Sequence, residues 1–187
     1  MFLETLKQQT SYFASDYKVY WSKRGEGNIL YSLLYLLTCH GLHSVALYRL
    51  GQIIYSIRLP LVSHVLKICY RITWFVLSTI YGISINPISK IGPGFYIGHY
   101  GGIFVRADIG ANCSISQGVT FGSKGAGKSN GWPTVEDNVY VGAGAKVIGS
   151  ITLGKGCVIG ANAVVTRDVP INALAVGIPA QVKLVIG

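Results

Sequence analysis

A six-residue repeat in the C-terminal part of the chain restricts the fold more than any other feature of the sequence. A large apolar residue stands at every sixth position, with one gap between Phe121 and Val135. Six residues match neither the 3.6-residue period of a helix nor the two-residue period of a strand. The repeated positions are Ile85, Ile91, Ile97, Ile103, Ile109, Ile115, Phe121, Val135, Val141, Val147, Leu153, Ile159, Val165 and Ile171.

This spacing predicts a three-sided β solenoid with about 18 residues in each coil, one short strand on each face and a turn at each corner. The repeated apolar residue points inwards, and glycine often follows it, where a corner needs conformational freedom. The residue four positions later is mostly small, because the interior of such a prism is narrow. Cys113 and Cys157 occupy that small position. We therefore expect both to fill the core and not to act as nucleophiles.

Residues 1–82 predict a helical region that precedes the β-helix domain at residues 83–187. Apolar residues recur there at spacings of three and four, and Pro60 is suited to begin a helix that ends near Tyr81. No charged residue lies between Glu26 and Arg49, a stretch long enough to span a membrane. Its Asn28, its histidines and its mid-segment glycine favour two shorter helices instead.

Charge and cysteine usage narrow the functional classes. The formal net charge is +9, but the basic residues are scattered and match no nucleic-acid-binding motif. The four cysteines form no CxxC pair, so a zinc ribbon is not expected. The N-terminus lacks the basic and apolar regions of a secretory signal, which predicts a cytoplasmic protein. Residues 59–74 mix Leu, Ile and Trp with Lys67 and Arg71, which suggests a peripheral contact with the membrane, at its inner face.

A glycine-rich, basic loop at residues 122–134 interrupts the repeat, and such loops often carry function. Its Gly127-Lys128-Ser129 is followed by Asn-Gly-Trp-Pro, so no helix begins there and a phosphate-binding P-loop is excluded.

His99 is the one histidine inside the repeat, next to a predicted corner and flanked by glycines. Transfer of an acyl group from a thioester to a hydroxyl needs a base for the hydroxyl proton, and imidazole suits this role near pH 7. The alternative from spacing alone is a structural corner histidine. For His40, His43 and His64, which lie in apolar helical segments, structural roles are expected. A single repeat-region histidine argues against the three-histidine zinc site of a hydrolyase-type solenoid.

Several segments resemble the bacterial transferase hexapeptide family, in its serine-acetyltransferase-like branch, and the resemblance covers roughly residues 12–187. The segments are GLHSVALYRL, IGPGFYIGHYGGI, SQGVTFG, VYVGAGAKVIGSITLG, IGANAVVTRDVP and VGIPA. The resemblance implies a left-handed parallel β-helix, a homotrimer, acetyl-CoA as co-substrate, no metal, and His99 as the catalytic base. It also implies a coenzyme groove between subunits, lined by Gly122, Ser123, Ala143, Gly144, Ala161 and Pro179.

The sequence departs from that branch at the positions that read the acceptor. Serine acetyltransferases carry Asp immediately before the catalytic His, where this chain has Gly98, and a further Asp where it has Ser84. Their Arg-His-Pro and Arg-Asp-Pro are matched here by Gly131-Trp132-Pro133 and Arg24-Gly25-Glu26. Ser84, Asn86 or a backbone carbonyl is left to orient His99.

Aromatic residues beside a glycine-lined cleft suit a sugar, and the expected acceptor-binding residues are Tyr96, Gly98, Tyr100 and Trp132. DYKVYWSKRG and YIGHYGG also resemble members of the branch associated with capsule, O-antigen or exopolysaccharide assembly. The main expectation is therefore an O-acetyltransferase acting on a carbohydrate acceptor in surface polysaccharide biosynthesis. Two alternatives stay open: a serine O-acetyltransferase of cysteine biosynthesis, and a non-enzymatic trimeric scaffold in a polysaccharide assembly complex.

Overall fold

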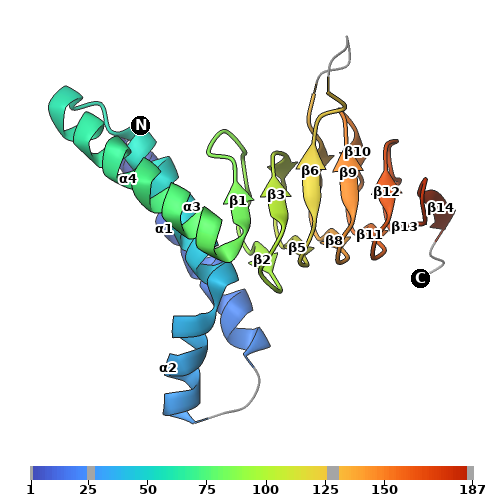
Figure 1. Ribbon diagram of the computed structural model, residues 1–187, viewed down its shortest axis with the longest axis horizontal. Coiled ribbons are helices and arrows are strands. Elements are labelled where there is room, and N and C mark those ends of the chain that lie inside the picture. Colours follow the sequence, from blue (N-terminus) through green and yellow to red (C-terminus); the bar gives the residue numbers. More distant parts are fainter. Residues whose placement is uncertain (1, 25–27, 126–130, 185–187) are drawn as a thin grey trace.

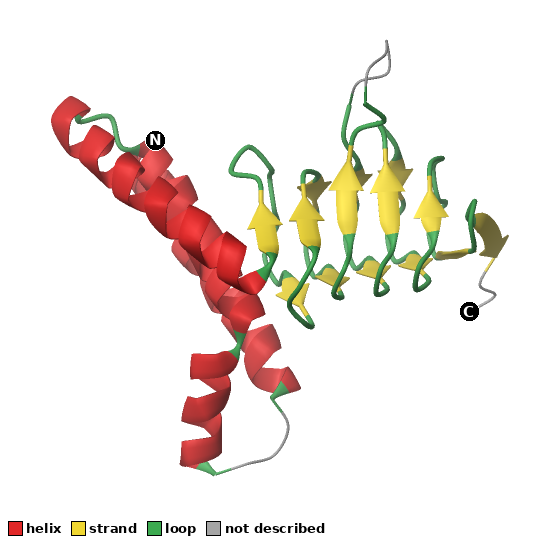
Figure 2. Cartoon of the chain, viewed as in Figure 1, coloured by secondary structure: helices red, strands yellow, loops and turns green. Residues whose placement is uncertain are grey.

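The structure is a computed structural model that describes residues 2–24, 28–125 and 131–184. Its described N-terminal part is helical (Figures 1 and 2), with helices α1 Phe2–Lys23, α2 Ile29–Thr38, α3 His40–Ser56 and α4 Pro60–Tyr81. The side chain of Asn28 caps α2 by accepting a hydrogen bond from the Tyr31 N–H at 2.9 Å. Gly82, with φ of 63°, ends α4 in the left-handed conformation that glycine tolerates. The predicted limits of this last helix are confirmed.

The described remainder of the chain forms short strands. Their bounds are β1 Ile83–Ile85, β2 Tyr96–Ile97, β3 Ile103–Val105, β4 Asp108–Ile109, β5 Ser114–Ile115, β6 Thr120–Gly122, β7 Thr134–Val135, β8 Tyr140–Val141, β9 Lys146–Ile148, β10 Thr152–Leu153, β11 Val158–Ile159, β12 Val164–Val165, β13 Ala173–Val176 and β14 Gln181–Leu184. They pair into three sheets, in the orders β1-β3-β6-β9-β12, β10-β7-β4 and β14-β13-β11-β8-β5-β2. All pairs between named strands are parallel except β13 with β14. The chain therefore winds as a parallel β-helix, which leads away from the helices in Figure 1. Its predicted left-handed sense, and the division into two domains at residue 82, stay predictions.

The register confirms the predicted length of the coil. Tyr96 pairs with Ser114 and Tyr140 pairs with Val158, and each pair is 18 residues apart. Ser114 and Tyr140 are also paired, 26 residues apart. The eight additional residues are those of the interrupting loop, so the strands on either side of it continue the same sheets.

The inward ladder is also confirmed, with one exception. Thirteen of the fourteen repeated apolar residues are buried in a single core that runs along the β-helix. Ile171 is instead 63% exposed, so its predicted inward position is wrong. Leu153 lies beside Val169 in the next coil, because the turn after Val165 is two residues shorter than the repeat. Val169 therefore takes the buried place.

The corners of the coil use a feature that the repeat did not predict. Four asparagines, Asn112, Asn138, Asn162 and Asn172, adopt positive φ values of 54° to 59°. Asparagine is one of the few non-glycine residues that tolerates this region. Asn162 stands beside Gly144, whose φ is 72°, so one corner carries glycine in one coil and asparagine in the next.

Both repeat-region cysteines lie in the core as predicted, which leads to a first testable prediction. Burial raises the pKa of Cys113 to about 11 and that of Cys157 to about 12, so neither thiol ionises near pH 8. The thiolate is the reactive form. At pH 8, iodoacetamide should label the exposed Cys69 and leave Cys113 and Cys157 unmodified until urea is added. Peptide mapping by mass spectrometry checks this, and equal labelling of Cys157 and Cys69 in the native protein would contradict it.

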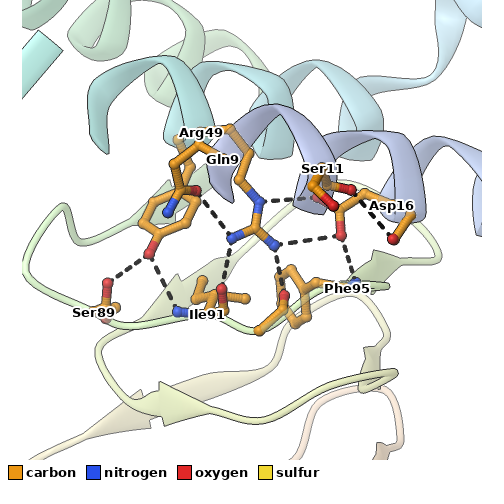
Figure 3. Close-up of polar contacts among 10 residues, drawn as sticks. Gln9, Ser11, Asp16, Arg49, Ser89, Ile91 and Phe95 are labelled. Atoms are coloured by element: carbon orange, nitrogen blue, oxygen red, sulfur yellow. Dashed lines mark hydrogen bonds and ion pairs between the residues drawn. The ribbon is translucent and has the colours of Figure 1, made fainter. Parts of the chain in front are cut away.

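The helices cover the open end of the β-helix, where backbone groups of the first coil have no further strand to pair with. Side chains of α1 take two of its N–H groups: Asp16 accepts from the Phe95 N–H and the Tyr20 hydroxyl accepts from the Ile97 N–H, both at 2.8 Å. Arg49 of α3 donates to the carbonyls of Ile91 and Gly92, each at 2.6 Å (Figure 3). This polar layer fixes β2, and the loop after β2 carries His99.

Helix α4 is long and apolar enough to cross a membrane by length and composition, and 11% of its most apolar window is buried. The charge-free stretch around α2 and α3 is bent by 62° at its break, so it forms the two shorter helices that were predicted. One or two helices of this kind are weak evidence for a membrane span.

Candidate active site

His99 stands in the turn that joins β2 to β3. Just before it, Ile97 is held by Tyr20, and Gly41 of α3 faces Ile97 so closely that a Cβ there would lie 3.1 Å from the Ile97 side chain. The His99 side chain is exposed, and its ring makes no hydrogen bond to any residue that the structure describes. A structural role for this histidine therefore finds no support within the subunit, and the ring is available to a ligand.

A cavity of about 460 Å³ opens beside His99, between the turn and the helices. Its walls come from the end of α1, from α2, from the start of α3 and from β2 with the residues after it. The lining residues are Lys23, Tyr35, Thr38, Cys39, His40, Gly41, Tyr96, Ile97, Gly98, His99 and Tyr100. Lys23 Nζ lies 5.8 Å from the centre of the Tyr96 ring. Burial raises the pKa of Tyr96 and of Tyr35, so both phenols stay protonated and able to donate hydrogen bonds at neutral pH.

Aromatic rings join the helices to the His99 turn. The ring of His40 lies 4.5 Å from those of Tyr81 and Tyr100, measured between centroids. His43 bonds the Leu36 carbonyl at 2.8 Å through Nε2 and the Tyr81 hydroxyl at 3.3 Å through Nδ1. The structural role expected of His43 fits these bonds, whereas His40 lines the cavity.

Sequence reasoning missed the helical half of this cavity. Lys23, Tyr35, Cys39 and His40 lie outside the repeat, and no spacing in the sequence points from them to His99. The signal that existed was indirect. The buried polar residues of α1 and α3, such as Asp16 and Arg49, need partners, and those partners are the backbone of the first coil.

Three of the four residues expected to bind the acceptor meet at this cavity, namely Tyr96, Gly98 and Tyr100. Trp132 does not line it; the guanidinium of Arg106 lies 4.0 Å from its ring centre. Neither residue proposed to orient His99 bonds it within the described subunit. Asn86 Oδ1 accepts instead from the Ile88 N–H at 2.9 Å, and Ser84 pairs with Phe104 inside a sheet.

The residues expected to line the coenzyme groove fall into two groups. Ala143, Gly144, Ala161 and Pro179 lie at the same corner of the prism as the His99 turn, in successive coils. The ladder along this edge runs from the Gly118 N–H to the Gly101 carbonyl, from Gly144 to Gln117 and from Asn162 to Ala143, at 2.7 to 2.9 Å.

The other group is Gly122 and Ser123, which lie at the far end of β6, across one face of the prism. Pro179 also lines a hollow of about 400 Å³ at the last coil, together with Thr166, Arg167 and Asp168. Among the described residues, no three His, Cys, Asp or Glu side chains gather in a way that would hold a metal ion.

Comparisons with known proteins identify the class of this fold and site. Residues 133–167 match the family model described as bacterial transferase hexapeptide (six repeats). The chain is 38% identical over 149 residues to the serine acetyltransferase of Bacillus pumilus, covering 79% of this chain and 65% of that protein. It is 38% identical over 148 residues to the Helicobacter pylori serine acetyltransferase, covering 78% of this chain and 82% of that protein.

A solved structure agrees with these relatives. The serine acetyltransferase of Brucella abortus in complex with coenzyme A superposes with a TM-score of 0.81 at 27% identity, over 100% of this chain and 72% of that one. The fold is thus that of a hexapeptide-repeat acyltransferase. The chain belongs to the serine acetyltransferase family, and it spans about two thirds of the length of the Bacillus pumilus relative.

These findings correct the expectation of a carbohydrate acceptor. The relatives and solved structures named above are serine acetyltransferases, so the resemblance to polysaccharide-assembly members is not supported and the main functional expectation is wrong. Gly98, Trp132 and the other departures were interpreted as a change of acceptor. The shared sequence outweighs them, because it extends through most of the chain and the departures are a few single positions.

Proposed function

We propose that this protein is an acetyl-CoA-dependent serine O-acetyltransferase, the alternative that the sequence left open. The observation that carries the proposal is the position of His99, an exposed imidazole at the mouth of a 460 Å³ cavity, in a chain of the serine acetyltransferase family. A cavity of this volume accommodates an amino acid with room to spare.

In the proposed reaction, His99 takes the proton of the serine hydroxyl as its oxygen attacks the thioester carbonyl. The C–S bond then breaks, the acetyl group is on the serine oxygen, and the thiolate of coenzyme A takes up the proton. Because a thiolate is a good leaving group, no covalent enzyme intermediate is needed. Backbone N–H groups of the glycine-rich turn at residues 98–102 are candidates to stabilise the tetrahedral oxyanion.

The coenzyme is proposed to bind along the corner that carries Ala143, Gly144, Ala161 and Pro179. Small residues there allow a ligand to approach the backbone closely. A homotrimer, with this groove between subunits, is part of the proposal, as are Gly122 and Ser123 contributed from the neighbouring face. A cytoplasmic location also stays a prediction.

The decisive experiment measures release of the coenzyme A thiol when purified protein receives acetyl-CoA and L-serine. We expect serine-dependent turnover, with O-acetylserine identified by mass spectrometry, and no turnover when L-alanine, which lacks the hydroxyl, replaces serine. Thiol release that does not depend on serine, but does depend on another hydroxyl compound, would overturn the proposed acceptor and keep the acyl transfer. Absence of any acetyl-CoA binding in calorimetry would overturn the enzymatic proposal.

A further inference from the structure

One face of α4 is covered by nothing in the subunit, although it is strongly apolar. The exposed residues on this face, the α4 apolar face, are Leu61, Val62, Val65, Ile68, Ile72, Phe75, Val76 and Ile80. Successive members are mostly three or four residues apart, so they form one stripe along the helix. Between Leu61 and Ile80 the stripe extends for about 30 Å, at 1.5 Å per residue. A continuous exposed patch of this kind marks an interaction surface.

The opposite side of α4 is fixed to the protein. Tyr70 is buried against α3, where Gly51 has no side chain and leaves room for the tyrosine ring. The indole of Trp74 donates to the Ile85 carbonyl at 3.3 Å, which ties the helix to β1. A membrane-spanning arrangement would break these contacts. An arrangement in which α4 lies flat on a surface keeps them all.

Charge indicates what kind of surface this is. The sequence contains no Asp or Glu between residues 27 and 107, so no acidic side chain of α4 or its flanks borders the stripe. On the helical wheel, His64, Lys67 and Arg71 follow one edge of the stripe. Two copies of this helix packed face to face would bring like charges together, with no carboxylate on either copy to pair with them.

An apolar hollow lies at the start of the same helix. It measures about 420 Å³ and is lined by Phe2, Ile57, Arg58, Leu59 and Val62. Val62 belongs both to this hollow and to the α4 apolar face, so the two form one continuous apolar surface. A hollow of this size and composition suits part of a lipid acyl chain.

We propose that the α4 apolar face docks the protein on an anionic lipid surface, with α4 lying in the interface. The apolar side chains enter the boundary between headgroups and acyl chains, while Lys67 and Arg71 contact the phosphates from the edge of the stripe. This docking goes beyond the acyl transfer proposed above and does not depend on which acceptor is used.

The test is flotation of the full chain with vesicles, either of phosphatidylcholine alone or with a third of phosphatidylglycerol. We expect binding to the phosphatidylglycerol vesicles, weakened by raising the salt concentration. The pair Ile68→Gln and Ile72→Gln should lower the partition coefficient at least tenfold. Its matched control, Ile88→Gln with Ile171→Gln, removes two exposed isoleucines elsewhere and should leave binding unchanged.

A charge pair gives an independent readout. Lys67→Gln with Arg71→Gln should weaken binding to anionic vesicles about fivefold per charge, and Lys155→Gln with Lys183→Gln should not. Three results would overturn the proposal: no vesicle binding by the unaltered chain, equal losses for the test and control pairs, or a large assembly in solution that the Ile68/Ile72 pair dissociates. The last would assign the face to a second copy of the chain. Serine-dependent thiol release without vesicles is measured in parallel, so failure of the proposed activity is seen separately.

Discussion

Replacing His99 with alanine should lower the rate of acetyl transfer by a factor of about 100 to 10,000, the usual contribution of a general base. The side chain is exposed and bonds no described residue, so its removal leaves no buried group without a partner. The melting temperature should therefore stay within about 1 °C of that of the unaltered protein, because surface changes of this kind cost little. The measurement is kcat for thiol release at saturating acetyl-CoA.

A matched control separates base catalysis from a general loss of histidine. His64 is also exposed, and its ring bonds only the Pro60 carbonyl of its own helix. His64→Ala should keep full activity in solution. Added imidazole should restore part of the rate to His99→Ala, because a free base can enter the cavity that the alanine enlarges. A kcat for His99→Ala within threefold of the unaltered value would show that another group takes the proton.

The β-helix was predictable because its constraint is local and repeated. Each coil needs an apolar residue inside, and the same need recurs every six residues, so thirteen positions were located from spacing alone. The error at Ile171 arose where the rule changes, since a shortened turn shifts the inward position to Val169. Nothing in the spacing announces a turn that is two residues shorter.

The site was predictable only in the part that belongs to the repeat. His99, Tyr96, Gly98 and Tyr100 are brought together by one strand and its turn, so their proximity follows from sequence order. The opposite wall comes from α1, α2 and α3, and its place depends on how those helices pack on the first coil. That packing is a tertiary choice, set by buried polar groups, which no local period encodes.

The acceptor illustrates a different limit. Single positions such as Gly98 and Trp132 were weighed more heavily than the similarity of the whole chain. Trp132 then proved to contact Arg106 and to lie outside the cavity. An argument from a missing residue needs the geometry of its surroundings before it can identify a substrate.

Replacing Arg49 with methionine should produce the largest loss of stability of any single change, about 3 to 5 kcal/mol in the free energy of unfolding. Arg49 and Asp16 are both buried, and their Nε and Oδ2 atoms are 2.9 Å apart (Figure 3). The guanidinium also holds two carbonyls of the first coil. Methionine fills similar volume but leaves the Asp16 carboxylate buried without its cation and those carbonyls without a donor.

The loss should depend on pH in a direction that identifies its cause. Burial raises the pKa of Asp16, and the Arg49 guanidinium and the Phe95 N–H oppose that effect. Without Arg49, burial is less opposed and the pKa rises further, so the folded variant favours the protonated acid. A raised pKa in the folded state stabilises at low pH, and this stability is lost as pH increases. The gap between variant and unaltered protein should therefore narrow as pH falls from 7 towards about 4, near the ordinary pKa of aspartate.

Urea unfolding at a fixed protein concentration, followed by circular dichroism, measures both effects. Arg167→Met is the matched control, because Arg167 is exposed, and it should change the unfolding free energy by less than about 0.5 kcal/mol. Because Asp16 also holds the Phe95 N–H, four residues before His99, Arg49→Met should lower activity as well. If Arg49→Met costs no more than the control, the polar layer between the helices and the first coil does not hold the two parts together, and the position of His99 must depend on other contacts.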